Sequence, residues 1–224
     1  MDIAQAVARR ASVRAFLPRA VPQATLRTLL EGAAQAPSGG NLQPWRVHVL
    51  TGTALAALQQ RVRQAIVEGL PQTLEYPVYP ERLWEPYRQR RRAAGAERFA
   101  ALGVADKDPG AQREMLLRNA AFFGAPVGLF FCVDRRFAAP QWSDLGMYMQ
   151  TLMLLAVAQG LDTCPQEVWS NWPDTLRAQL GLDDDHMVFA GMSLGYRDPD
   201  SPLNAFRTGR APLDSFVTWH GCTG

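Results

Sequence analysis

Lysine is almost absent from this chain. Lys107 is the only lysine, and arginine supplies the rest of the 23 basic side chains. With 21 acidic residues the formal net charge is only +2, which is too small for a protein that binds nucleic acid through charge. Most of the arginines therefore need no special role, although guanidinium groups do suit phosphates and other planar anions.

Cysteine is also scarce. Cys132, Cys164 and Cys222 are the only three, and no two of them form a Cys-x-x-Cys pair. An odd number of widely spaced cysteines argues against a disulfide scaffold, and the three isolated histidines give no metal-ligand spacing. No apolar run reaches the ~20 residues that span a bilayer, and the first residues lack the layout of a signal peptide. We therefore expect a reduced cytoplasmic protein with no metal and no membrane segment.

The hydrophobic fraction of 47% is enough for a sizeable core, and the length fits a single domain over residues 1–224. Apolar periodicity and breaker residues predict the regular elements. Helices are expected at 2–9, 22–30, 53–67, 88–102, 111–123 and 144–159, and strands at 44–50, 126–133 and 187–196. No Gly-x-Gly-x-x-Gly follows a strand, so the fingerprint of a Rossmann dinucleotide site is missing.

Two segments point to a second copy of the chain. The helix predicted at 144–159 is apolar on nearly every side, so it must be buried all round, which in so small a protein indicates a subunit interface. The tail at 216–220, Phe-Val-Thr-Trp-His, is typical of a strand but follows a loop rich in breakers. Together they predict a homodimer.

Residues 71–110 differ in character from the rest. Prolines interrupt them, and aromatic residues such as Tyr76 and Trp84 are interleaved, which indicates a lid-like insertion without a core of its own. Its basic run at 88–92 has two interpretations. A basic patch with aromatic neighbours is able to bind single-stranded nucleic acid. Glutamates flank the run, however, so we expect a solvated helix face and no nucleic-acid partner.

Four separate segments carry side chains suited to chemistry. In the first, Arg10, Ser12 and Arg14 alternate, so an extended backbone would point all three the same way. Two guanidinium forks with a hydroxyl between them suit a phosphate or another planar anion. The alternative is an ordinary solvated basic segment.

The second segment is the loop from Pro37 to Trp45. Small residues let its backbone approach a flat ligand closely, and Asn41 and Gln43 offer donors and acceptors to a heterocycle edge. An ordinary connecting loop is the alternative.

The third and fourth segments lie in the second half of the chain. Cys164 stands in Cys-Pro-Gln-Glu, where no histidine or other base is placed to activate it, so a buried inert thiol is expected rather than a nucleophile. Arg207 and Arg210 lie three residues apart in a later loop, and this pair again suits an anion.

In this order and at these separations the four segments resemble the nitroreductase family, over nearly the whole chain from Arg9. Three patterns look closest to the branch that reduces nitrobenzoates: Cys-Pro-Gln-Glu-x-Trp, Leu-Gly-Tyr-x-Asp-Pro-Asp and Arg-x-x-Arg-x-Pro-Leu. The resemblance implies an α+β fold with a central, mostly antiparallel sheet flanked by helices, and an intertwined homodimer. It also implies FMN as cofactor and NAD(P)H as co-substrate.

The resemblance further implies roles for single residues. Arg10 and Ser12 would hold the phosphate or ribityl end of FMN, and Arg14 would reach the pyrimidine edge and stabilise the anionic reduced flavin. A backbone N–H near Glu167 would meet flavin N5, so Glu167 and Arg14 are the expected catalytic residues. The remaining cofactor contacts would come from Pro37, Ser38, Gly39 and Asn41, lent by the partner subunit, and from Pro165, Gln166, Arg207 and Arg210.

This chain departs from the family at two points. Many relatives carry lysine where it has Arg14, and the family's extra pyrimidine contact after the first strand has no clear counterpart. Tyr76, Trp84 and Phe123 are expected to line the channel for a nitroaromatic or quinone-like acceptor, which would react by ping-pong hydride transfer.

Two alternatives remain open. The first is another reaction on the same fold: ene reduction, flavin fragmentation, or reductive dehalogenation with Glu75, Tyr76 and Arg82 holding a zwitterion. The second is a non-enzymatic flavin-binding protein.

Overall fold

The computed structural model describes residues 1–70, 73–105 and 108–221. The helices are α1 (Ile3–Arg9), α2 (Gln23–Ala33), α3 (Gly52–Glu68), α4 (Tyr87–Ala101), α5 (Pro109–Ala120), α6 (Ala139–Ala158) and α7 (Pro173–Leu180). The strands are β1 (Arg46–Thr51), β2 (Val127–Asp134), β3 (Asp162–Gln166) and β4 (His186–Gly195). Five 3-10 turns complete the described elements: η1 (Gly39–Asn41), η2 (Phe122–Gly124), η3 (Glu167–Asn171), η4 (Pro202–Asn204) and η5 (Leu213–Ser215).

The four strands form one sheet in the order β1-β2-β4-β3, and every neighbouring pair is antiparallel. This arrangement confirms the expected antiparallel sheet flanked by helices. The two central strands, β2 and β4, are buried along almost their whole length, as strands covered on both faces must be.

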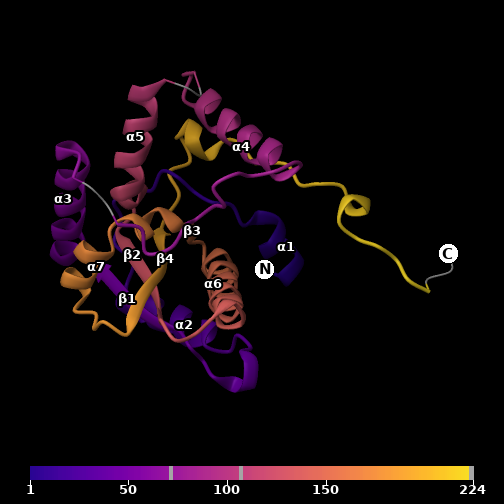
Figure 1. The fold of residues 1–224 in the computed structure, drawn as a ribbon, viewed down its shortest axis with the longest axis horizontal. Helices are drawn as coiled ribbons and strands as arrows, with labels where there is room; N and C mark the ends of the chain where they lie inside the picture. Colours follow the sequence, from indigo (N-terminus) through magenta and orange to yellow (C-terminus); the bar gives the residue numbers. More distant parts are fainter. Residues whose placement is uncertain (71–72, 106–107, 222–224) are drawn as a thin grey trace.

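Each face of the sheet contributes to its own hydrophobic core. Because successive strand residues point to opposite faces, Leu129 and Phe131 of β2 pack with α2 and α6, whereas Phe130 and Cys132 join the core under α3 and α5. Figure 1 shows α2 and α6 on one side of the sheet and α3, α5 and α7 on the other. The molecule is therefore a three-layer sandwich built on four strands.

All the helices and strands predicted within residues 1–196 are present, with shifted ends, and two elements were missed. The strand β3 was not predicted because its sequence, Asp-Thr-Cys-Pro-Gln, is polar and contains proline. Proline is tolerated there because β3 is an edge strand. The helix α7 has only eight residues, too few for a clear apolar period, and begins at Pro173.

One predicted helix ends earlier than expected, and one predicted strand is absent. The helix expected at 111–123 ends at Ala120, because Phe122, Phe123 and Gly124 all adopt positive φ and reverse the chain. The tail at 216–220 forms no strand and runs away from the body of the protomer (Figure 1). A strand needs a neighbour for its backbone hydrogen bonds, and no described element lies beside this tail.

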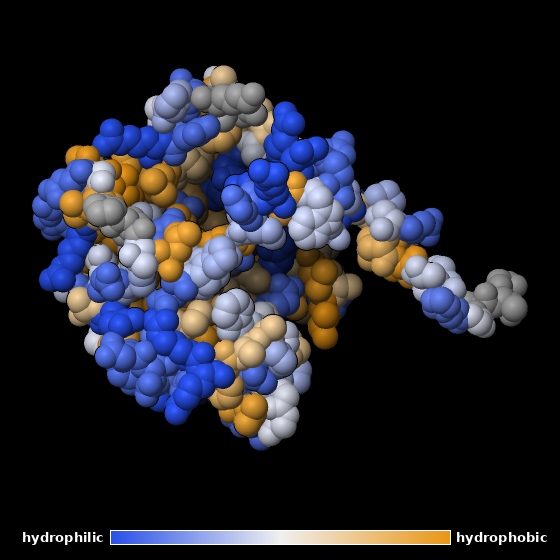
Figure 2. Space-filling model, in the orientation of Figure 1, coloured by the Kyte–Doolittle hydropathy of each residue, from blue (hydrophilic) through white to orange (hydrophobic). Residues whose placement is uncertain are grey.

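The segment from 73 to 105 packs loosely on the rest. Its helix α4 contains no buried residue, and hydrophilic side chains cover it in Figure 2. Its partly buried hydrophobic residues, Phe99 and Leu102 among them, pack against the core of the main body. Among the described residues, no helix is long and apolar enough to cross a membrane.

Candidate functional site

Four arginines from two distant parts of the chain line one cavity of about 520 Å³. Arg10 and Arg14 come from the segment after α1, with Ser12 between them, and Arg207 and Arg210 come from the loop after η4. As the alternation in the sequence predicted, Arg10, Ser12 and Arg14 all line this one cavity.

The first segment is extended because it attaches to the edge of the sheet. Ser12 forms a parallel bridge with Thr163 of β3, and the N–H of Val13 donates to the Thr163 carbonyl over 3.0 Å. The N–H of Arg14 then donates to Oδ1 of Asn204 over 2.8 Å. Both anchors hold backbone atoms, so the two arginine side chains reach the cavity, where Nη1 of Arg14 donates to the Ser12 carbonyl over 3.1 Å and its other N–H groups remain available to a ligand.

The arginines of the cavity repel one another. Burial lowers the pKa of Arg10, and the positive charges of Arg210 and Arg207 lower it further. The guanidinium of Arg207 is held by the carbonyls of Ala8 and Arg9, and that of Arg210 by Thr208 and Gly209. None of these partners carries a negative charge, so the cavity holds uncompensated cations that an anionic ligand would neutralise.

A second cationic region lies beside Cys164 in β3. Burial raises the pKa of this thiol, as expected for an inert cysteine, while the charges of Arg14 and Arg98 act in the opposite direction. Arg98 comes from α4, and its pKa is lowered by burial and by the nearby charge of Arg14. Its Nε is buried and has no hydrogen-bond partner within the described structure.

Sequence reasoning missed Arg98, because a basic helix face predicts exposure. The one available signal was its spacing from Arg91, seven residues or two helical turns earlier, which places both on one face of the helix.

The other end of β3 leads to Glu167 and Tyr76. Burial raises the pKa of the Glu167 carboxyl, although the residue keeps access to solvent. Burial also raises the pKa of Tyr76, and the negative charge of Glu167 adds to the effect. The side chain of Gln166 is engaged elsewhere: Nε2 donates to the Asn119 carbonyl over 2.7 Å, and Oε1 accepts from Ser193 over 2.8 Å.

The loop from Pro37 to Asn41 is mostly exposed and lines no part of the arginine cavity of its own chain. It is tethered to α6, because the N–H of Gly39 donates to the buried carboxylate of Asp144 over 3.2 Å. Ser38 steadies the turn by accepting from the N–H of Gln43 over 3.0 Å.

The three expected channel residues are not equivalent. Tyr76 is half-buried and Trp84 is 59% exposed, with its ring edge-on to Tyr87. Phe123 is only 7% exposed and belongs to the core beneath α3 and α5, since its positive φ turns the chain inward. Phe123 is therefore a core residue, and Tyr76 and Trp84 are the more exposed of the three.

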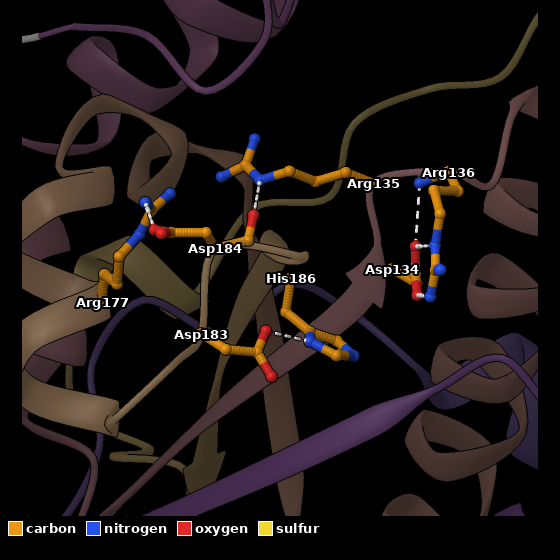
Figure 3. A network of polar contacts seen from close by, with 7 residues as sticks. All are labelled: Asp134, Arg135, Arg136, Arg177, Asp183, Asp184 and His186. Atoms are coloured by element: carbon orange, nitrogen blue, oxygen red, sulfur yellow. Dashed lines mark hydrogen bonds and ion pairs between the residues drawn. The ribbon is translucent and has the colours of Figure 1, made fainter.

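The residues proposed for a dehalogenase do not converge. The Glu75 carboxylate is 6% exposed and pairs with Arg135. Figure 3 shows the other contact of Arg135, in which Nε donates to the Asp184 carbonyl over 3.0 Å. The hydroxyl of Tyr76 donates to the Phe189 carbonyl, and Arg82 lines a different cavity. Glu75 and Tyr76 thus attach the 73–105 segment to the body and do not present an acid and a phenol to a ligand.

The side chains present fit FMN. The charges of Arg207 and Arg210 act on Arg10, so these three cations lie near one another, as a terminal phosphate requires. Arg14 lines the same cavity and would supply a cation for the electron-rich pyrimidine edge. The end of β3 and the adjoining Glu167 extend over about 10 Å from Cys164, at about 3.3 Å per residue. No cluster of metal-ligating side chains occurs among the described residues.

Comparison with known proteins identifies the fold. The chain is 40% identical to a chloronitrobenzene nitroreductase of Comamonas testosteroni, over 94% of this chain and 93% of that protein. It is 38% identical to a 4-nitrobenzoate reductase of Pseudomonas putida, over 98% and 96% of the two chains. A crystal structure of the FMN and NADPH-dependent nitroreductase NfnB from Sphigopyxis sp. strain HMH superposes with a TM-score of 0.96 at 42% identity, covering 99% of this chain and 100% of that one.

The family model of the nitroreductases matches residues 7–196, a range that contains Arg10, Ser12, Arg14 and the whole of β3. The matched range is most of the chain, and both sequence relatives are more than 30% identical over more than nine-tenths of it. The chain belongs to the nitroreductase family.

Proposed function

We propose that this protein is an FMN-dependent NAD(P)H oxidoreductase that reduces nitroaromatic compounds. The observation that carries the proposal is the set of uncompensated arginines around one cavity at the edge of the sheet, in a chain of this family. The similar proteins named as chloronitrobenzene nitroreductase and 4-nitrobenzoate reductase support the substrate class.

Bound FMN would supply the redox chemistry, accepting a hydride equivalent from NAD(P)H and delivering it to the acceptor. In this proposal Arg10, Arg207 and Arg210 bind the phosphate, with Ser12 donating a hydrogen bond. Arg14 carries its charge to the pyrimidine edge, where it favours the added negative charge of the reduced state. Pro165, Gln166 and Glu167 contribute backbone along the ring, because the side chain of Gln166 is already engaged in the core.

The substrate side of the site would be shared. The start of the 73–105 segment, which carries Tyr76 and Trp84, lies against η3, because the N–H of Glu75 donates to the Ser170 carbonyl over 2.9 Å. Glu167 begins this turn, and its charge contributes to raising the pKa of Tyr76. A single open face suits two substrates that bind in turn, so we expect ping-pong kinetics. Tyr76 and Trp84 would then determine which nitroaromatic is accepted.

The active assembly would be a homodimer. Loop 37–41 lines no part of its own chain's arginine cavity, and the side chains of Leu213, Phe216 and Trp219 are exposed on the extended tail. Apolar side chains on a projecting tail gain stability by packing on a second copy of the chain. In this assembly Pro37, Ser38, Gly39 and Asn41 would complete the partner's flavin site.

The proposal is tested with purified protein. We expect a yellow protein that releases FMN and not FAD, and that oxidises NADPH or NADH faster when a nitrobenzoate is added. Protein that neither contains nor binds FMN would refute the proposal. Flavin-loaded protein that reduces an activated alkene but no nitroarene would support the alternative reaction, and flavin-loaded protein without turnover would support a binding role.

A further inference from the structure

A second cavity, of about 960 Å³, lies between α4 and the residues that lead into it. One wall is the helix, which contributes Arg88, Arg91, Arg92 and Arg98. The opposite wall is residues 79–83, which contribute Arg82 and the single carboxylate of Glu81. Five guanidinium groups against one carboxylate make this space strongly cationic, whereas the chain as a whole is near neutral.

The helical arginines follow the periodicity of one face. Counted from Arg88, the next three arginines of the cavity follow after three, four and ten residues, so all four share one side of α4: Arg88, Arg91, Arg92 and Arg98. Gly95 lies in the middle of this side, and a Cβ added there would meet no atom within 4 Å. Glycine inside a helix costs about 1 kcal/mol relative to alanine, and here no packing contact requires it. Its effect is to leave the floor of the cavity open.

Few of these charges are satisfied within the chain. Arg88 pairs with Glu85 over 2.7 Å, but Arg82 and Arg91 enter no ion pair in the described part of the structure. The guanidinium of Arg91 lies over the ring of Tyr79, 4.3 Å from its centre, which fixes its plane while leaving its N–H groups available. Arg91 and Arg82 thus lie on opposite walls of the cavity with no carboxylate paired to either, and two such guanidinium groups suit an anion.

Helix α4 lies beside the flavin site, because it packs against η4, whose Asn204 accepts from the N–H of Arg14 over 2.8 Å. Arg98 of this helix lines the cavity, and its pKa is lowered by burial and by the charge of Arg14. With a rise of about 1.5 Å per residue, Arg91 lies about 10 Å along the helix from Arg98. A ligand bound in this cavity would therefore reach the flavin site at one end and place an anionic group between Arg82 and Arg91 at the other.

We propose that this cavity binds the 2′-phosphate on the adenosine ribose of NADPH, and that Arg82 and Arg91 make the enzyme prefer NADPH to NADH. The inference rests on the proposed function, which requires a nicotinamide co-substrate to reach the flavin. NADPH and NADH differ only in this phosphate, and a dianion gains most from two guanidinium groups that are not already paired with a carboxylate. The pyrophosphate common to both co-substrates would lie nearer Arg98.

The test uses the FMN-loaded protein with Arg91→Ala and the double variant Arg82→Ala/Arg91→Ala. Arg90→Ala is the matched control, since Arg90 belongs to the same helix but faces Tyr87 and does not line the cavity. Binding of adenosine 2′,5′-bisphosphate and of adenosine 5′-monophosphate is measured by calorimetry, and KM is measured for both co-substrates. Thermal unfolding confirms that the variants fold.

For Arg91→Ala we expect about tenfold weaker binding of the bisphosphate and a similar rise in KM for NADPH. The KM for NADH and the binding of the monophosphate should stay within about twofold, and Arg90→Ala should match the wild type. Equal losses for both co-substrates, or no loss for either, would overturn the assignment of the 2′-phosphate. A wild-type protein that binds the bisphosphate through Arg91 but oxidises neither co-substrate would refute the proposed function and support the site.

Discussion

Replacing Arg210 with alanine tests the phosphate end of the flavin site most directly. Its guanidinium donates to the Thr208 carbonyl over 2.9 Å, the Gly209 carbonyl over 3.0 Å and the Thr208 hydroxyl over 3.1 Å. All three acceptors belong to its own turn, so the side chain connects no two elements of the fold. Arg210→Ala should therefore leave the stability of the FMN-free protein nearly unchanged.

Two effects of the Arg210→Ala substitution both weaken FMN binding. Loss of a hydrogen bond to a charged group costs about 1.5–3 kcal/mol. In addition, the charge of Arg210 lowers the pKa of Arg10 in the free cavity, and a phosphate would relieve that repulsion on binding. The variant loses both contributions, so its Kd for FMN should rise by roughly 10- to 100-fold.

In the assay, FMN-free protein is titrated into FMN at several salt concentrations, and binding is monitored by the quenching of flavin fluorescence. Arg9→Ala is the control, because Arg9 is exposed, does not line the cavity, and keeps the backbone carbonyl that holds Arg207. The wild-type Kd should rise with salt, and that dependence should be weaker in Arg210→Ala because one screened charge is gone. An Arg210→Ala protein with the wild-type Kd and salt dependence would show that the phosphate binds elsewhere.

Four further outcomes are expected. Light scattering should give twice 24.8 kDa, and a stable flavin-loaded monomer would contradict the dimer. Arg14→Ala should slow flavin reduction about tenfold in stopped-flow experiments even with FMN bound, and an unchanged rate would exclude its electrostatic role. Burial raises the pKa of Glu167, so the folded state favours the neutral carboxyl. The contribution of Glu167 to the free energy of unfolding is therefore greatest below the ordinary carboxyl pKa, and it is lost as the pH rises through the pKa of the folded state. Glu167→Gln should therefore raise the Tm of FMN-free protein at neutral pH and match the wild type near about pH 4, whereas equal Tm values at both would refute this assignment. Gly191→Ala should destabilise by at least ~1–3 kcal/mol by thermal unfolding, since its Cβ would lie 2.2 Å from Cδ1 of Trp169, and a wild-type Tm would mean that this ring moves freely.

Much of the fold could be predicted from the sequence because its long elements are strongly periodic. The strand β2 and the helix α6 each consist largely of apolar residues, and both were predicted and are present. The strand β3 has no such pattern: it depends on β4 for its hydrogen bonds and on its edge position to accommodate Pro165. The tail could not be placed because a segment beside no described element of its own chain has no local pattern that fixes its conformation.

The candidate site was predictable to the same degree. Alternation along an extended segment indicated that Arg10, Ser12 and Arg14 would share a cavity, and the structure places them so. The environment of Arg98 results instead from the packing of α4 near Arg14, between residues far apart in the sequence. A basic helix face does not reveal which of its arginines will be partly buried.

The position of β1 at the edge of the sheet has a consequence for handling the protein. Among the described residues only β2 pairs with it, so the backbone groups of alternate residues that point away from β2 have no strand partner, and Val49 is 40% exposed on this strand. An uncovered edge of this kind is a template on which another chain adds as a strand, and Arg46 is the only charged residue on β1 that opposes this. A substitution that removes the charge of Arg46 should therefore cause aggregation and poor soluble expression before it changes catalysis.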